Sequence, residues 1–157
     1  MALKKKKTKG NRKNSPDISH VKGNVNIIYR YGENETPPIR CIPVHPGAFA
    51  GREDYLTKIE SAFRKNDTAS ITQTVKGLGG VGKSMLAREY ALRYGKANPK
   101  ATVYWFEAED SDKIEKSVNC FLNAARWTQT RPGMLLSEEL QGWYASHSGF
   151  LLVFDTT

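Results

Sequence analysis

The strongest chemical signal in this sequence is a glycine-rich segment that could bind phosphate. Residues 77–84 read GLGGVGKS and fit the pattern G-x-x-x-x-G-K-[ST] without a mismatch. The glycines let the backbone wrap closely, so that successive N–H groups point into one concavity. Lys83 would place its charge on the β and γ phosphates, and the Ser84 hydroxyl would bind Mg²⁺. The residues expected to contact the nucleotide are Gly77, Leu78, Gly79, Gly80, Val81, Gly82, Lys83, Ser84 and Met85.

An acidic residue near the end of the sequence could complete such a site. Asp155 directly follows the apolar run FLLVF at residues 150–154. A carboxylate at the end of a buried strand can hold the Mg²⁺ shell beside the phosphate-loop hydroxyl. We therefore expect Ser84 and Asp155 to be the metal-binding residues, and Lys83 and Asp155 to act on the phosphates. The alternative is an ordinary strand that ends in an exposed aspartate.

Strand and helix patterns alternate around these residues. Apolar or β-branched runs predict strands at 70–75, 102–106 and 150–154. Helical spacing predicts helices at 52–65, at 84–94 with Gly95 as the stop, at 111–126 with Ser111 as N-cap, and from 137 to about 143. Strands that alternate with helices of this length indicate an α/β fold, a parallel sheet with helices on both faces. One further strand, at 24–31, is expected to be isolated from these, and the alternative is that it packs on the main domain.

The composition divides the chain of 157 residues into three parts. Residues 1–23 form a predicted disordered basic tail, because eight of the 24 basic side chains lie in residues 1–22. Residues 24–47 contain the short strand and a proline-rich linker, and residues 48–157 form the main domain. The rest of the chain is nearly neutral, so a nucleic-acid partner is not expected. No apolar run could span a bilayer. Two cysteines without metal spacing favour a cytoplasmic protein, with nuclear import through Lys4–Lys9 as an alternative.

The segment GLGGVGKSMLAREYALRYG resembles the phosphate-loop helix of STAND-class P-loop NTPases of the NB-ARC type, the repeat-fused, NLR-like group. Residues 49–53 (FAGRE), 103–109 (VYWFEAE) and 150–155 are similar to other motifs of that family, so the resemblance covers about residues 48–157. It implies a three-layer α/β/α NTPase domain that binds ADP or ATP with Mg²⁺ as a switch in signal transduction of the innate-immunity type. It also implies that the backbone at Phe49 and Ala50 and the Arg52 side chain face the nucleotide. The alternative for Arg52 is a surface ion pair with Glu53 or with a neighbouring residue.

The sequence departs from this family in two ways. The family places a further acidic residue after its strand-end aspartate, whereas Thr156 and Thr157 follow Asp155, so we do not count on ATP hydrolysis. In the family's sheet, one further strand lies between the phosphate-loop strand and the strand that ends in the aspartate. The resemblance implies that this further strand comes after residue 157 in the sequence. The sheet is therefore predicted to be incomplete, with unpaired strand edges and low stability. Protein partners are expected to bind through other domains of a longer protein.

Two other classes of function are consistent with the same residues. One is an AAA-like ATPase or small P-loop kinase, although a kinase would need an arginine-bearing lid after Asp155. The other is an assembly fragment with a vestigial nucleotide site. In that case residues 24–31 (NVNIIYRY) would mediate homotypic assembly by stacking in register as cross-β.

Overall fold

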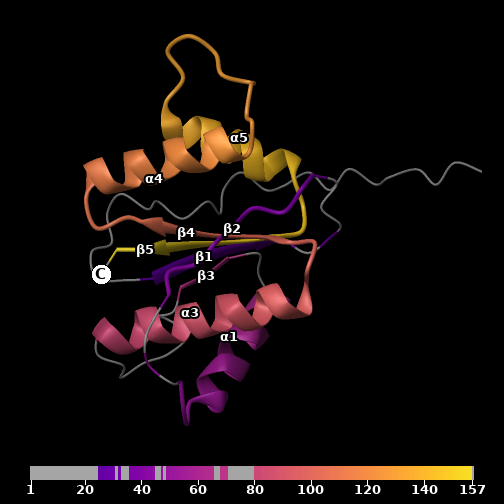
Figure 1. Cartoon of the computed structure of the whole chain (residues 1–157), viewed down its shortest axis with the longest axis vertical. Coiled ribbons are helices and arrows are strands. Elements are labelled where there is room, and N and C mark those ends of the chain that lie inside the picture. Colours follow the sequence, from indigo (N-terminus) through magenta and orange to yellow (C-terminus); the bar gives the residue numbers. More distant parts are fainter. Residues whose placement is uncertain are drawn as a thin grey trace, which may run out of the picture.

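The computed structural model describes residues 25–30, 32, 36–44, 47, 49–65, 68–70 and 80–156. Their strands form one five-stranded sheet in the order β2-β4-β5-β1-β3 (Figure 1). The strands are β1 (Val25–Arg30), β2 (Arg40–Cys41), β3 (Thr68–Ser70), β4 (Thr102–Glu107) and β5 (Phe150–Asp155). β2, β4 and β5 run parallel to one another, whereas β1 is antiparallel to both of its neighbours, β5 and β3.

Helices cover both faces of this sheet (Figure 1). The helices α1 (Glu53–Lys65) and α3 (Gly80–Ala97) lie on one face, and α4 (Ser111–Ala124) and α5 (Leu136–Ser146) lie on the other. The described chain is thus a mixed α/β structure in three layers, which confirms the predicted α/β class. The prediction of a parallel sheet is wrong, because β1 runs antiparallel to both of its neighbours. The strands expected at 102–106 and 150–154 and the helix expected at 52–65 are also confirmed. No helix among the described residues has the length and apolarity that crossing a membrane requires.

Side chains of each central strand point alternately to the two faces of the sheet and pack into two separate cores. The core under α1 and α3 is mainly aliphatic, and that under α4 and α5 is mainly aromatic. In the aromatic core the rings of Phe106 and Phe154 stack 4.6 Å apart, and Phe121 meets Trp143 edge-on at 4.8 Å. β4 and β5 are buried on both faces, as their continuous apolar sequences predict.

The expectation that the first strand stands alone is wrong. β1 pairs with β5 over six residues, from Val25 opposite Asp155 to Arg30 opposite Phe150, and with β3 over three. Val25 and Ile27 pack into the aliphatic core, and Ile28 packs into the aromatic one. The β-branched sequence therefore has two apolar faces to fill, and burying both outweighs leaving the strand in solvent. β1 also occupies the place between β3 and β5 where the sequence predicts unpaired edges, so this reason for low stability disappears.

The segment expected to be an extended linker contributes the edge strand β2. The N–H of Val103 donates to the Ile39 carbonyl oxygen at 2.9 Å, and the Ile39 N–H donates to Thr102 Oγ1 at 3.1 Å. The Arg40 guanidinium donates to the Asn98 carbonyl oxygen at 2.6 Å, at the end of α3. A side chain at Gly95 would collide with this guanidinium. Gly95 therefore does not stop the helix as expected; it leaves room for Arg40 while α3 continues to Ala97.

The starts of the two later helices differ by one residue from the expectation. Asp110, not Ser111, caps α4, because its carboxylate accepts a hydrogen bond from the Lys113 N–H at 2.8 Å. In α5 the Glu138 side chain accepts from the Leu135 N–H at 2.9 Å. The strand expected at 70–75 lies outside the described residues except for Ser70, the last residue of β3, and the basic tail lies wholly outside them.

Candidate functional site

The described part of the phosphate-loop motif forms the first turn of α3. The helix begins at Gly80 and not at Ser84 as expected, so residues 80–83 are helical and not part of a wrapping loop. The half-buried Lys83 and Ser84 lie in its first turns with Met85. Gly77, Leu78 and Gly79 lie outside the described residues. The first turn of α3 contains no acidic side chain, so nothing on it offsets the partial positive charge of the helix N-terminus. Such a terminus can bind an anion through its unsatisfied N–H groups.

The topology brings this turn and Asp155 to the same end of the sheet. β3, β4 and β5 all run in one direction, and α3 returns between β3 and β4, so α3 starts where the strands finish. In Figure 1 the C-terminus and the magenta, N-terminal end of α3 both lie at the left of the sheet. Asp155 is the half-buried last residue of β5, and its carbonyl oxygen accepts from the Ala108 N–H at 2.8 Å. Loops at the carboxyl ends of parallel strands are where α/β sheets bind ligands.

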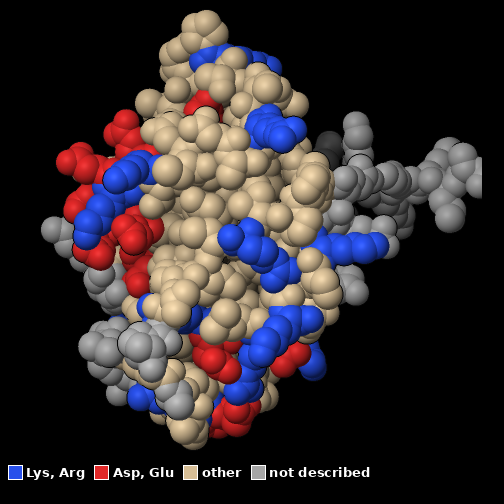
Figure 2. All heavy atoms as spheres, viewed as in Figure 1, with Lys and Arg blue, Asp and Glu red and all other residues tan. Residues whose placement is uncertain are grey.

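Carboxylates gather at the same end of the sheet. Glu107 and Asp155 are Cα partners at the ends of β4 and β5. Exposed Glu109, Asp110 and Asp112 follow in the turn and the start of α4, and acidic side chains are dense at the left of Figure 2. Glu109 forms an ion pair with Lys113 at 2.5 Å. A polyphosphate at this edge would face negative charge, so a divalent cation between phosphate and carboxylate would be strongly favourable.

The segment 49–53 packs along the side of α3. The Arg93 guanidinium donates to both oxygens of Glu53 and to Glu89, each at 2.7 Å, and lies 6.0 Å from the Phe49 ring centroid. The hydrogen bonds from Arg93 lower the pKa of the Glu53 carboxyl, and those to Glu53 and Glu89 raise the pKa of Arg93. Arg93 follows Ser84 by nine residues, about 14 Å along the helix axis. Phe49 thus lies beside the C-terminal half of α3, and Ala50 is exposed.

Arg52 is half-buried and has a hydrogen-bonding group without a partner. Its Nη1 is inaccessible to solvent and forms no hydrogen bond among the described residues. Glu53 is held by Arg93, so the alternative of a surface ion pair is left to another neighbour of Arg52. A buried guanidinium nitrogen without an acceptor is unfavourable, and an anionic or polar ligand would satisfy it. Arg52 therefore fits a ligand-facing role, although the Phe49 segment is docked away from the first turn of α3.

Sequence reasoning missed Arg93, the residue that holds the segment 49–53 against α3. Its spacing of four from Glu89 predicts a helical ion pair. The contact with Glu53 joins residues 40 positions apart, so only the packing of α1 on α3 reveals it.

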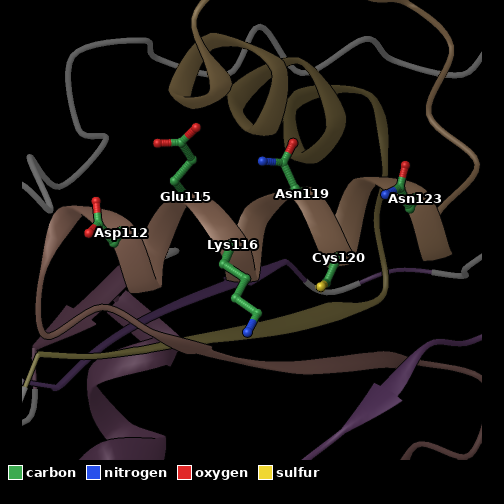
Figure 3. A pocket seen from close by; sticks show the side chains of 6 residues that line it. All are labelled: Asp112, Glu115, Lys116, Asn119, Cys120 and Asn123. Carbon is green, nitrogen blue, oxygen red and sulfur yellow. The ribbon is translucent and has the colours of Figure 1, made fainter.

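A second concave surface lies on α4, in the layer opposite α3, and it shares Asp112 with the carboxylates at the end of the sheet. It is lined by side chains of α4 alone: Asp112, Glu115, Lys116, Asn119, Cys120 and Asn123. In Figure 3 these side chains diverge, with Lys116 and Cys120 pointing toward the sheet and the others away from it.

Both cysteines of the chain are free and exposed. Burial, reinforced by the thiols of Cys41 and Cys120, raises the pKa of the neighbouring Tyr104 to about 12, so this phenol is neutral at physiological pH.

Comparison with known proteins gives one partial relative. Over 62 residues the chain is 37% identical to a protein of Hyaloscypha variabilis named "Nucleotide-binding leucine-rich repeat (NLR)-like protein". The match covers 38% of this chain and 6% of that protein, so the chain spans a small fraction of its relative's length. No family model matches the chain, and no solved structure matches it. The chain is thus similar in part to an NLR-like protein.

Proposed function

We propose that this chain is a nucleotide-binding module of the NB-ARC or STAND type, which holds ADP or ATP with Mg²⁺ as part of a signalling switch. The observation that carries the proposal is the location of the GKS end of the phosphate-loop motif. It forms an acid-free helix start at the same end of the sheet as Asp155. The partial likeness to a protein named as nucleotide-binding and NLR-like supports the same class. Partners would then bind through other domains of such a protein.

Each residue of the proposed site has a distinct role. The N–H groups at the start of α3 bind phosphate oxygens, and Lys83 adds a positive charge to them. Ser84 and Asp155 hold Mg²⁺, which also screens the carboxylates at this edge. The unpartnered Nη1 of Arg52 offers a donor to the nucleotide. Binding, not turnover, is the proposed activity, because the residue directly after Asp155 is Thr156, which has no carboxylate to orient a water molecule.

Calorimetric titration with ADP and with Mg·ATP tests this proposal. We expect micromolar affinity, weakened at least roughly tenfold in Lys83→Ala, because a charge-assisted phosphate contact contributes about 1.5–3 kcal/mol. Lys96→Ala is the matched control, since Lys96 is exposed near the other end of the same helix. Asp155→Asn should weaken Mg·ATP binding more than ADP binding without metal. A folded chain that binds neither nucleotide would refute the proposal, and rapid turnover would favour the AAA-like alternative.

A further inference from the structure

Arg88 lies on the side of α3 that faces the sheet and has a hydrogen-bond donor without a partner. The guanidinium carbon lies over the Trp105 ring of β4, 5.6 Å from its centroid. The Nε of Arg88 is inaccessible to solvent and forms no hydrogen bond among the described residues. Arg88 also forms no ion pair within the described part of the chain, and the adjacent Glu89 is held by Arg93. A half-buried cation in this state would gain from an anionic ligand.

The direction of the Arg88 side chain brings its guanidinium toward the first turn of α3. Arg88 follows Ser84 by four residues, so the two side chains lie on the same face of the helix, one turn apart. Side chains on an α-helix lean toward its N-terminus, and an arginine is long enough to span one turn of about 5.4 Å. We therefore expect the guanidinium near the level of Ser84, at the end of the helix that would bind phosphate.

The position of Trp105 on β4 leads to the same end of the sheet. Trp105 precedes Glu107, the last residue of β4, by two residues, which is about 7 Å along the strand. Trp105 and Val153 are Cα partners and pack into the aliphatic core, on the face that α3 covers. Alternate residues of a strand share a face, so Glu107 and Asp155 belong to this face as well. The Arg88 guanidinium thus lies on the same face as the two strand-end carboxylates, near the carboxyl end of the sheet.

A polyphosphate is the anion that fits this arrangement. Arginine binds phosphate through two parallel hydrogen bonds, and contact with an aromatic ring restricts the orientation of the guanidinium before the ligand arrives. We propose that Arg88 is a second positively charged contact for the phosphates of the nucleotide. This inference rests on the proposed nucleotide site and adds a specificity-determining residue to it. Because the charge of Arg88 adds to that of Lys83, it favours ADP over AMP.

Titration of the full chain with ADP and with inorganic pyrophosphate tests this contact. Arg88→Met removes the guanidinium but keeps an unbranched apolar side chain to cover Trp105. We expect it to weaken the binding of both ligands at least roughly tenfold, because each loses a hydrogen bond between charged groups. Arg88→Gln, which is neutral but polar, should show the same loss and replaces the methionine variant if that variant does not fold. Arg64→Met is the matched control, since it makes the same charge change near the end of α1 that precedes β3.

Nuclear magnetic resonance separates a direct contact from an effect on packing. The Nε–H resonance of Arg88, assigned by its absence in Arg88→Met, should shift when ADP or pyrophosphate is added, whereas that of Arg64 should not. ADP binding that is lost in Lys83→Ala but unchanged in both Arg88 variants would overturn the contact and leave the proposed function intact. Weaker binding of ADP alone, with pyrophosphate binding unchanged, would overturn the contact with phosphate. A folded parent chain that binds neither ligand would refute the nucleotide site and this role of Arg88 together.

Discussion

β5 has two neighbours that pair with it over equal lengths but belong to the fold in different ways. β4 pairs with β5 in parallel over six residues, and β1 pairs with it antiparallel over six residues. The parallel pair is joined through α4 and α5, which cover the aromatic core between them. The antiparallel pair is joined through the rest of the chain, and the next described element after β1 is the edge strand β2, not a helix. The two ladders therefore have the same length, but the connections that join each neighbour to β5 along the chain differ.

This difference shows that the stability a strand contributes by burial is distinct from the way the strand is connected along the chain. Both neighbours contribute fully buried side chains to the same two cores, so each should stabilise the folded sheet. Parallel strands need a crossover connection, which makes β4, α4, α5 and β5 one continuous unit. An antiparallel strand has no such requirement, so β1 pairs with β5 without a helical crossover between them. The predictions below examine this comparison, starting with the largest expected effect.

Truncation of one core residue on each strand should destabilise the protein by a similar amount. Ile27 of β1 and Leu151 of β5 are both fully buried in the aliphatic core. We expect Ile27→Ala and Leu151→Ala each to lower the free energy of unfolding by about 2–5 kcal/mol, measured by urea denaturation. If only Leu151→Ala lowers the midpoint, β1 separates before the sheet unfolds, and the two neighbours are not thermodynamically equivalent.

Removal of the α4 cap should affect the parallel pair selectively. Asp110→Ala removes the acceptor for the Lys113 N–H and should lower stability by about 1 kcal/mol. Asp110→Asn is the matched control, because asparagine also caps helices well. Amide hydrogen exchange should rise in α4 and β4 more than in β1. A uniform rise across all strands would show that the unit from β4 to β5 does not open separately from β1.

The smallest expected effect concerns pH and the contact between α1 and α3. Arg93 lowers the pKa of Glu53 below its ordinary value of 4.5, so this contact stabilises the fold above that value. The stabilisation is lost as the pH falls through the depressed pKa. Arg93→Gln should therefore make thermal stability less dependent on pH below about 4.5. Arg64→Gln is the control, since Arg64 forms an exposed pair with Glu60 at 3.7 Å on α1. Equal pH profiles for Arg93→Gln and the parent would contradict this assignment.

Much of the fold could be predicted because its signals are local. The apolar runs at 102–106 and 150–154 define β4 and β5, and the spacing of Leu56, Ile59 and Phe63 defines the buried face of α1. The predicted end of α3 is wrong because Gly95 does not act as a helix stop. A glycine is needed there because any side chain would collide with the guanidinium of Arg40, which is distant in the sequence. The N-cap of α4 was misplaced by one residue, within the precision of helix ends read from sequence.

For the candidate site, the sequence by itself determined which chemical groups are present, and the tertiary structure decided which of them lie close to one another. The GKS motif and the strand-end Asp155 follow from residue order alone, because each combines a local backbone pattern with a chemical group. Three other features depend on contacts between distant segments. They are the edge of the sheet that the motif and Asp155 share, the pairing of Glu53 with Arg93, and the position of β1 between β5 and β3. Such contacts are selected by burial of complementary faces, a property of the assembled sheet that no single segment carries.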